Sequence, residues 1–203
     1  MQNSCALTEL AERQKPGESG LLALDWWNGN RSILADFDLT GLMLGMTLRT
    51  KPEEIYRALI EATAYGMRVV VENYRQNGIA VDEINALGGI SQKNALAMQI
   101  YADVLNMPVH VIDCEQGGAL GSAIFAAAAA GVYPTVEEAI CAMAAPVLRT
   151  YTPVTENAAV YEELFAEYKR LHDYFGRGEN DVMKHLKCIR HAAIKPKGTE
   201  ENV

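Results

Sequence analysis

Residues 86–94, Ala-Leu-Gly-Gly-Ile-Ser-Gln-Lys-Asn, give the strongest indication of the fold, because an apolar run ends there in two glycines and polar residues follow. Ile84 to Leu87 predicts a short buried strand, and a helix is expected from about Gln92 to Leu105. Glycines at such a junction let a flat ligand or a phosphate approach the backbone, and a helix start offers free N–H groups. The spacing fits neither the G-x-G-x-x-G nor the Walker pattern, so a tight strand-to-helix turn without a ligand stays an equal alternative.

The segments on either side of this turn alternate between strand and helix patterns. Thr50 can cap a long helix while Glu53 reaches back to it, and Asn77-Gly78 is expected to end that helix. The other expected elements are strands within residues 21–24, 41–48 and 108–112 and helices over residues 117–130, 136–144 and about 157–175. The alternation in the middle of the chain predicts an α/β domain whose strands are backed by helices.

Composition divides the chain into four parts. Residues 1–20 are expected to be a polar, turn-rich lead-in ending at Gly20. Residues 21–150 hold the predicted α/β domain, and residues 151–178 hold a C-terminal helix. Residues 179–203 are polar and weakly patterned, so we expect a flexible tail there.

Several classes of protein are excluded by composition and charge. The chain has 203 residues, of which 49% are hydrophobic, which is enough for a sizeable core and too many for a disordered chain. Residues 1–180 carry a net charge of -10, and the five basic and three acidic side chains of residues 181–203 bring the total to -8. A surface this acidic repels phosphate backbones, so nucleic acid is not an expected partner.

Membrane and secretion signals are not expected either. Residues 116–136 carry no charge, but they hold four glycines, Pro134 and mostly small side chains, so they predict a buried helix rather than a membrane span. The first 14 residues contain no apolar core of a secretory signal. The four cysteines lack CxxC spacing, so a reduced, cytoplasmic protein is expected.

Two further segments are candidates for ligand contact. The stretch from Gln116 to Ser122 opens a helix with small residues, which favour close helix packing or a hinge. The loop from Asp25 to Arg31 sets polar side chains beside paired tryptophans, so a polar cleft and a turn with two half-buried rings both stay open. Residues 110–114, His-Val-Ile-Asp-Cys, alternate like a strand, and no Ser, His and acid set has catalytic spacing, so neither a metal site nor a triad is predicted.

At these positions the sequence resembles the FGGY carbohydrate kinases. Residues 41–46, Gly-Leu-Met-Leu-Gly-Met, followed after seven residues by residues 54–61, Glu-Ile-Tyr-Arg-Ala-Leu-Ile-Glu, are similar to the second signature of that family. Residues 86–94 resemble its adenosine motif, and residues 115–131 resemble its second interdomain connecting helix. The stretch LLALDWWNGNRS at residues 21–32 is similar to the form that this loop takes in the L-ribulokinases among them.

This resemblance implies a fold and a reaction. The fold would be an actin-like (ribonuclease H-like) ATPase domain with a mixed sheet flanked by helices, and residues 21–150 would be its C-terminal nucleotide-binding domain. The reaction would be phosphoryl transfer from ATP, with Mg²⁺, to L-ribulose in arabinose catabolism. Carried over by position, Gly88 and Gly89 would approach adenine and ribose, Ser91, Lys93 and Asn94 would frame the same pocket, and the helix from Gly117 would pivot.

The resemblance also implies what these residues lack. The family's phosphate loops, sugar domain and general base lie upstream of the matched motifs, and residues 1–20 supply none of them. We therefore expect no catalytic or metal-binding residue here, no turnover by these residues alone, and either the missing N-terminal half or a second copy of the chain as partner. The alternatives are a non-catalytic module that binds nucleotide or a partner, and a kinase portion for another sugar such as xylulose or glycerol.

Overall fold

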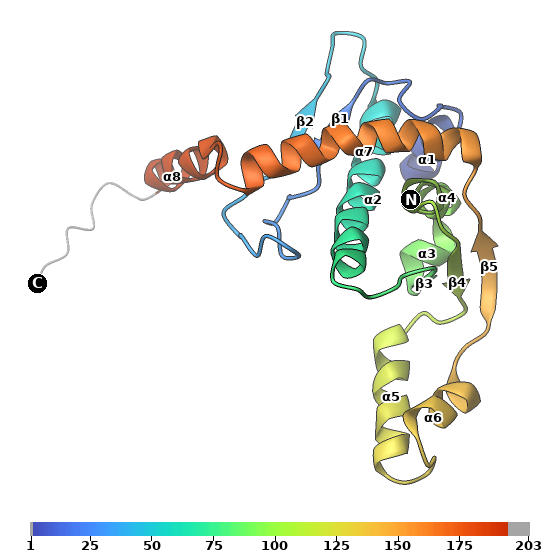
Figure 1. Ribbon diagram of the computed structural model, residues 1–203. Helices are drawn as coiled ribbons and strands as arrows, with labels where there is room; N and C mark the ends of the chain where they lie inside the picture. The colour runs from blue at the N-terminus through green and yellow to red at the C-terminus, as the bar shows by residue number, and fades with distance from the viewer. Residues whose placement is uncertain (1, 195–203) are drawn as a thin grey trace, which may run out of the picture.

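The computed structural model describes residues 2–194, in which helices surround two small sheets (Figure 1). The strands are β1 (Leu22–Leu24), β2 (Leu42–Leu44), β3 (Ile84–Ala86), β4 (Val109–Ile112) and β5 (Val147–Tyr151). The helices are α1 (Gln2–Glu12), α2 (Pro52–Gln76), α3 (Gly89–Lys93), α4 (Ala95–Leu105), α5 (Gly117–Ala129), α6 (Val136–Met143), α7 (Thr155–Gly176) and α8 (Val182–Ile194).

The predicted α/β architecture is confirmed. β3 and β4 pair in parallel through the helical crossover α3–α4, and β5 joins β4 antiparallel, which gives a three-stranded mixed sheet. β1 and β2 form a separate antiparallel pair. Two details differ from expectation: β5 was not predicted, and β3 is only half-buried at Ile84 and Ala86 rather than buried.

α2 is the long helix that the sequence predicts, but its cap lies one residue further on. Glu54 accepts a hydrogen bond from the Lys51 backbone N–H at 2.8 Å, and Lys51 rather than Thr50 is the N-cap residue. The Thr50 hydroxyl instead accepts from the Thr47 N–H at 2.8 Å, within the preceding turn. The helix ends at Asn77 as expected, where the N–H bonds back to the last turn.

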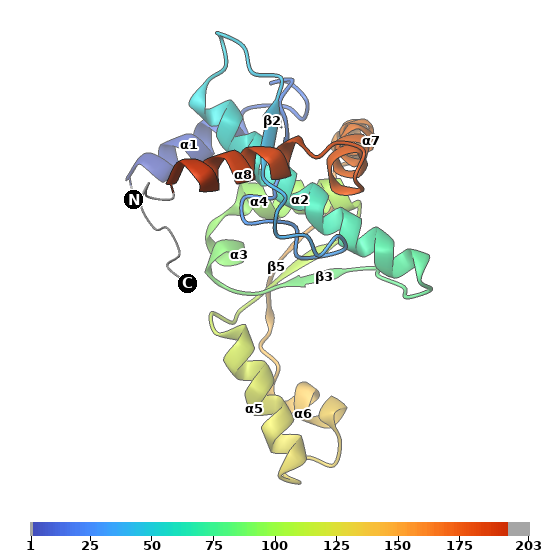
Figure 2. The same cartoon turned by 90° about the vertical axis from the view of Figure 1, so that its left-hand side faces the viewer.

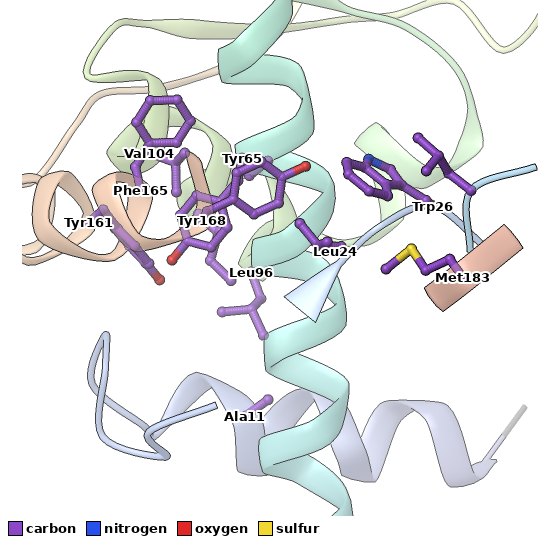
Figure 3. Packing of buried hydrophobic residues seen from close by; sticks show 13 residues of the cluster. Ala11, Leu24, Trp26, Tyr65, Leu96, Val104, Tyr161, Phe165, Tyr168 and Met183 are labelled. Atoms are coloured by element: carbon purple, nitrogen blue, oxygen red, sulfur yellow. The ribbon is translucent and has the colours of Figure 1, made fainter. Parts of the chain in front are cut away.

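The main core lies where α2, α4 and α7 meet β1. Tyr65 of α2 lies against three rings of α7, with centroid separations of 5.3–6.3 Å (Figure 3). Tilted ring pairs at these distances stabilise the packing beyond the area that they bury. Residues from distant parts of the chain, among them Ala11, Leu24 and Trp26, are thus joined into one core.

α1 is a helix that the sequence analysis did not predict, since residues 1–20 were expected to be a turn-rich lead-in. It packs on α2, and the buried guanidinium of Arg57 donates to the carbonyl oxygens of Ala11 and Gln14, both at 2.9 Å. The Ala11 carbonyl lies in the last turn of α1 and Gln14 lies two residues beyond its end, so these bonds tie the end of α1 and the turn after it to α2. Arg57 also pairs with Glu61 at 2.8 Å, which satisfies both buried charges.

The α5–α6 pair projects from the rest of the molecule (Figures 1 and 2). Both helices occur where they were predicted, but the expectation that residues 116–136 are buried is wrong. Ile124 is the one buried residue of α5, which packs mainly against α6. Small side chains permit close packing, yet within the described residues little of this helix is covered.

α8 is the second element missed, because residues 179–203 were expected to be a flexible tail. Its Met183 is buried beside Trp26, and its Lys184 pairs with Asp36 at 2.6 Å (Figure 3). Residues 195–203 of that predicted tail lie outside the described residues. The boundaries predicted at residues 20, 150 and 178 stay predictions.

Candidate functional site

The turn at the end of β3 has the strand-to-helix geometry that the sequence predicts. Gly88 has φ 97°, a conformation that side-chain-bearing residues rarely adopt, which explains glycine at this position. The Ser91 hydroxyl donates to the Gly88 carbonyl at 2.7 Å, and the Gly88 N–H donates to the Cys114 carbonyl at 3.2 Å. Gln92 of α3 reaches the Ile112 carbonyl at 3.3 Å. The turn is therefore fixed to the end of β4 by the Gly88 backbone and the Gln92 side chain.

Asn94 breaks the predicted single helix into α3 and α4. Its Oδ1 accepts from the Ala97 N–H at 3.0 Å as the N-cap of α4, and its Nδ2 donates to the Tyr56 hydroxyl at 3.1 Å. An Asn cap of this kind satisfies one of the free N–H groups of the first turn. Asn94 thereby links the glycine turn to α2.

A cavity of about 760 Å³ opens beside Asn94, between α2 and α4. Its walls are mainly apolar and aromatic; the lining residues are Trp27, Tyr56, Leu59, Ile60, Thr63, Ile90, Asn94, Ala97, Met98 and Tyr101. Trp27 is 56% exposed and Ile90 is 76% exposed, so two large apolar side chains face open space here. Concave apolar walls with one convergent amide are typical of a ligand pocket.

Of the five predicted site residues, one lines the cavity and four lie beside it. Asn94 lines the cavity, whereas Gly88, Gly89, Ser91 and Lys93 are not among its lining residues and lie in the adjoining turn and helix. A Cβ placed on Gly88 or Gly89 would meet nothing within 4 Å, so this face of the turn is open. Ser91 is buried with its hydroxyl bonded inside the turn, and Lys93 is exposed.

Sequence reasoning missed most of the cavity wall. Tyr56, Leu59, Ile60 and Thr63 recur at helical spacing on α2, and residues 97, 98 and 101 do so on α4. That periodicity was visible, but it predicts a core-facing stripe equally well. Only the packing of the two helices separates core from cavity.

A second cavity of about 510 Å³ lies under the loop from Asp25 to Ser32, so the polar cleft considered for this loop is present. Thr63 and Tyr101 line both cavities, which makes them neighbours. Asp25 faces the second one, and its Oδ1 accepts from the Tyr168 hydroxyl at 2.9 Å. Burial raises the pKa of the Asp25 carboxyl, while the Tyr168 hydrogen bond and His172 oppose that rise.

The loop that carries these residues is held in an uncommon conformation. Ile33 has φ 75° and Ala35 has φ 49°, and positive φ is costly for a β-branched residue such as Ile33. Backbone hydrogen bonds of 2.8 Å in both directions join Asn30 to Asp36 across the turn. The sequence analysis did not predict this bend, which α8 also contacts through the Lys184–Asp36 ion pair.

Of the segment from His110 to Cys114, residues 110–112 belong to β4, as the alternation predicts, and the strand ends before Asp113. His110 Nδ1 lies 2.8 Å from the Thr150 hydroxyl on β5, and Nε2 lies 3.3 Å from Glu83. Among residues 2–194, no three His, Cys, Asp or Glu side chains come together as a metal-holding group. Over the same residues, no helix has the length and apolar character needed to cross a bilayer.

Comparison with known proteins identifies the family. Residues 2–130 match the pattern of the C-terminal domain of the FGGY family of carbohydrate kinases. The chain belongs to this family. The match includes the glycine turn, both helices that line the large cavity, and α5.

Similarity to curated relatives extends beyond the family pattern. The chain is 56% identical over 191 residues to a ribulokinase of Geobacillus thermodenitrificans, covering 92% of this chain and 34% of the relative. It is 54% identical over 194 residues to a ribulokinase of Halalkalibacterium halodurans, covering 94% of this chain and 34% of that protein. The chain thus spans about a third of the length of the curated relatives that it matches.

Solved structures agree on the fold. A xylulose kinase from Lactobacillus acidophilus superposes with a TM-score of 0.72 at 26% identity, covering 82% of this chain and 34% of the other. A gluconate kinase from the same organism gives a TM-score of 0.73 at 25% identity, covering 85% and 34%. The predicted carbohydrate-kinase fold is therefore confirmed.

Proposed function

We propose that these residues are the nucleotide-binding C-terminal portion of an ATP-dependent L-ribulokinase. The observation that carries the proposal is the 54–56% identity to ribulokinases over more than nine-tenths of the chain. The reaction would transfer the terminal phosphoryl group of ATP to L-ribulose, giving ADP and L-ribulose 5-phosphate. A reducing, cytoplasmic setting belongs to the same proposal, supported by three free cysteines, Cys114, Cys141 and Cys188.

The cavity between α2 and α4 is our candidate for the adenine base. Its aromatic walls offer faces against which a flat heterocycle can stack, and the Asn94 amide lies at its edge. The open backbone of Gly88 and Gly89 would run alongside the ribose, with Lys93 exposed nearby. Ser91 would act as a positioning residue, because its hydroxyl closes the turn at 2.7 Å instead of facing the cavity.

Magnesium is proposed to arrive with the nucleotide. The described residues bring together no group of three ligating side chains, so they do not fit a protein-held metal centre. Mg²⁺ is commonly bound through substrate phosphates with few protein ligands. Its contacts would then come from the nucleotide phosphates, and these residues are assigned no step that involves the metal.

Turnover by residues 1–203 alone is not expected. Phosphoryl transfer depends on positioning and charge stabilisation around the transferred group. A charge-assisted contact to phosphate is worth about 1.5–3 kcal/mol, so a site without three such contacts would bind on the order of a thousandfold more weakly. The proposed partner is the remaining two-thirds of a ribulokinase chain or, failing that, a second copy of these residues.

Two alternatives remain as outcomes of the test. A non-catalytic module would bind nucleotide or a partner chain and would not contribute to turnover when the other part is supplied. A kinase for another sugar is suggested by the solved xylulose and gluconate kinases, but their identity of 25–27% is about half that of the ribulokinases.

Enzymatic assay of the purified chain tests the proposal. ADP release is measured with magnesium-ATP, with and without L-ribulose, first alone and then with the N-terminal two-thirds of a ribulokinase relative. We expect no sugar-dependent release alone and recovery on mixing. Robust release by the chain alone would contradict the claim of incompleteness, and recovery with D-xylulose but not L-ribulose would contradict the proposed sugar.

A glycine pair tests the nucleotide site independently of turnover. Gly89→Phe should weaken ADP binding by about tenfold or more, because the ring would fill the open face of the turn. Gly118→Phe is the matched control, since its Cβ also meets nothing within 4 Å and it lies on the projecting α5. Isothermal titration calorimetry with ADP measures both, and equal affinity of the two variants would contradict the assignment.

A further inference from the structure

A third cavity, of about 300 Å³, lies between α8 and the loop of residues 27–40. The loop and α8 each contribute apolar and polar side chains, and the basic ones all come from α8. The lining residues are Trp27, Asn28, Gly29, Phe37, Leu39, Thr40, Met183, Leu186, Lys187, Arg190 and His191. Neither the glycine turn nor Asn94 lines it, and Trp27 is the one lining residue that it shares with the proposed nucleotide cavity.

The ionisable side chains that line this cavity are all basic. Its lining holds three basic side chains and no acidic one, although the chain as a whole has 26 acidic residues against 18 Lys and Arg. Lys187 donates to the Phe37 carbonyl and to Asp38, both at 2.8 Å, which fixes its ammonium at the cavity edge. The side chains of Arg190 and His191 make no hydrogen bond or ion pair with any other residue of 2–194. The Arg190 guanidinium and the His191 ring are therefore available to a ligand.

Further features point to an anion with a carbon skeleton. The Asn28 amide and the Thr40 hydroxyl line the same space and have no hydrogen-bond partner among the described residues. Trp27 and Phe37 are 56% and 61% exposed, so two aromatic faces stay open beside the basic groups. A guanidinium fork binds phosphate oxygens in two parallel hydrogen bonds, and an aromatic face can cover the apolar side of a small polyol.

We propose that this cavity binds the phosphate monoester of a small polyol or sugar. The phosphate would lie at Arg190, with His191 and Lys187 beside it, and the carbon chain would lie against Trp27. This site goes beyond the proposed function and does not rest on it. Five of its lining residues belong to α8, outside the family match at residues 2–130, and the other six belong to the loop.

The cavity shares its loop with the two larger ones. Trp27 lines the cavity between α2 and α4 as well, and Asn28 and Gly29 line the cavity under the Asp25 loop. Binding beside α8 should therefore change the surroundings of Trp27. The chain has two tryptophans, of which Trp26 is buried, so intrinsic fluorescence reports mainly on changes at Trp27.

The test titrates the full chain with a pentose 5-phosphate, with the same pentose unphosphorylated, and with inorganic phosphate, at constant ionic strength. Tryptophan fluorescence and calorimetry are the readouts. We expect the pentose phosphate to bind most tightly and the unphosphorylated pentose not to bind. Arg190→Gln should weaken binding about tenfold or more through loss of the charge-assisted bonds.

Two further variants make the outcome decisive. Arg13→Gln removes the same charge from an exposed position near the N-terminus, outside the cavity lining, and should leave the affinity unchanged. Leu186→Glu adds a negative charge to the lining at a residue that is 59% exposed, and should abolish binding without unfolding the protein. The proposal is overturned if Arg190→Gln binds as the parent does, or if Arg13→Gln weakens binding equally.

Equal affinity for inorganic phosphate and pentose phosphate would overturn the assignment to a monoester. ADP binding, measured in parallel, separates this site from the nucleotide site: Arg190→Gln should leave ADP affinity within about twofold, whereas Gly89→Phe should not affect the pentose phosphate. Loss of both affinities in Arg190→Gln would show that the two cavities are a single site, and would overturn the proposal.

Discussion

The Asp25 carboxyl has a pKa that its surroundings shift. Its Oδ1 is bonded to the Tyr168 hydroxyl, and a Cβ on Gly66 would lie 2.6 Å from Oδ2, so glycine leaves room for the carboxyl. Burial raises its pKa above the ordinary value of 3.8, while Tyr168 and the buried His172 favour the charged form. The folded protein therefore holds this proton to higher pH than the unfolded chain does.

The first prediction concerns the pH dependence that follows. The stabilising effect of protonating Asp25 is fully present below its unfolded pKa and is lost as pH rises through the raised folded pKa. Asp25→Asn keeps an acceptor for Tyr168 and removes the buried charge, so its stability relative to the parent should improve from pH 4 to pH 7. Urea unfolding at several pH values measures this.

Asp82→Asn, at an exposed position before β3, is the control for loss of one negative charge. A stability difference for Asp25→Asn that stays constant across the pH range would contradict the raised pKa. A decline toward neutral pH would mean that the Asp25 carboxylate is stabilising, with the Tyr168 hydrogen bond outweighing the effect of burial.

The predicted site residues illustrate what sequence can supply at this scale. Gly88 was identifiable because a positive φ at a strand-to-helix junction calls for glycine. The sequence could not distinguish the roles of Ser91 and Asn94. The Ser91 hydroxyl turns inward to the Gly88 carbonyl, whereas the Asn94 side chain caps α4 at the cavity edge. Side-chain direction at a turn depends on packing that no local pattern encodes.

At the scale of elements, α8 is held by a few side-chain contacts, so single substitutions can test how it is docked. Met183 is 5% exposed and belongs to the core cluster, and Lys184 and Lys187 bind the loop of residues 36–38. Met183→Ala should weaken the docking of α8 by about 2–5 kcal/mol, because it removes its one buried side chain.

Amide hydrogen exchange measures the effect of Met183→Ala residue by residue. Protection should fall across residues 182–194 and stay unchanged in α4, since local opening does not require global unfolding. Ile189→Ala, at a residue that is 52% exposed, is the control and should change stability by less than about 0.5 kcal/mol. Equal loss of protection in α4 would mean that α8 unfolds only together with the core.

The elements that sequence predicted are those with local signals. α2 has charged residues at its start, a helical apolar stripe and Asn77-Gly78 at its end, and its limits were predicted within one or two residues. α1, β5 and α8 depend on partners distant in sequence: Arg57 completes the end of α1, β4 pairs with β5, and the 36–38 loop holds α8. Tertiary contacts outweigh weak local propensity in each case.

At the scale of the whole molecule, the projecting α5–α6 pair exposes apolar surface. Phe125 is 64% exposed and Val132 is 67% exposed, and both lie on the segment expected from sequence to be buried. Large exposed apolar patches mark interaction sites. The sequence of residues 116–136 is apolar enough to predict burial, and another protein segment that packs over Phe125 would provide that burial.

The last prediction is that the chain self-associates through this pair when no other partner is present. Sedimentation velocity should show a sedimentation coefficient that increases with protein concentration between about 5 and 200 µM. Exposed apolar surface drives association at such concentrations. Phe125→Glu should keep the protein monomeric across that range, because burying an unpaired carboxylate is costly. Ile79→Glu, at a residue 52% exposed after α2, makes the same charge change elsewhere and should associate as the parent does. A parent that stays monomeric across that range would contradict the prediction. An Ile79→Glu variant as monomeric as Phe125→Glu would shift the origin of association to net charge or to the open edges of the β1–β2 sheet.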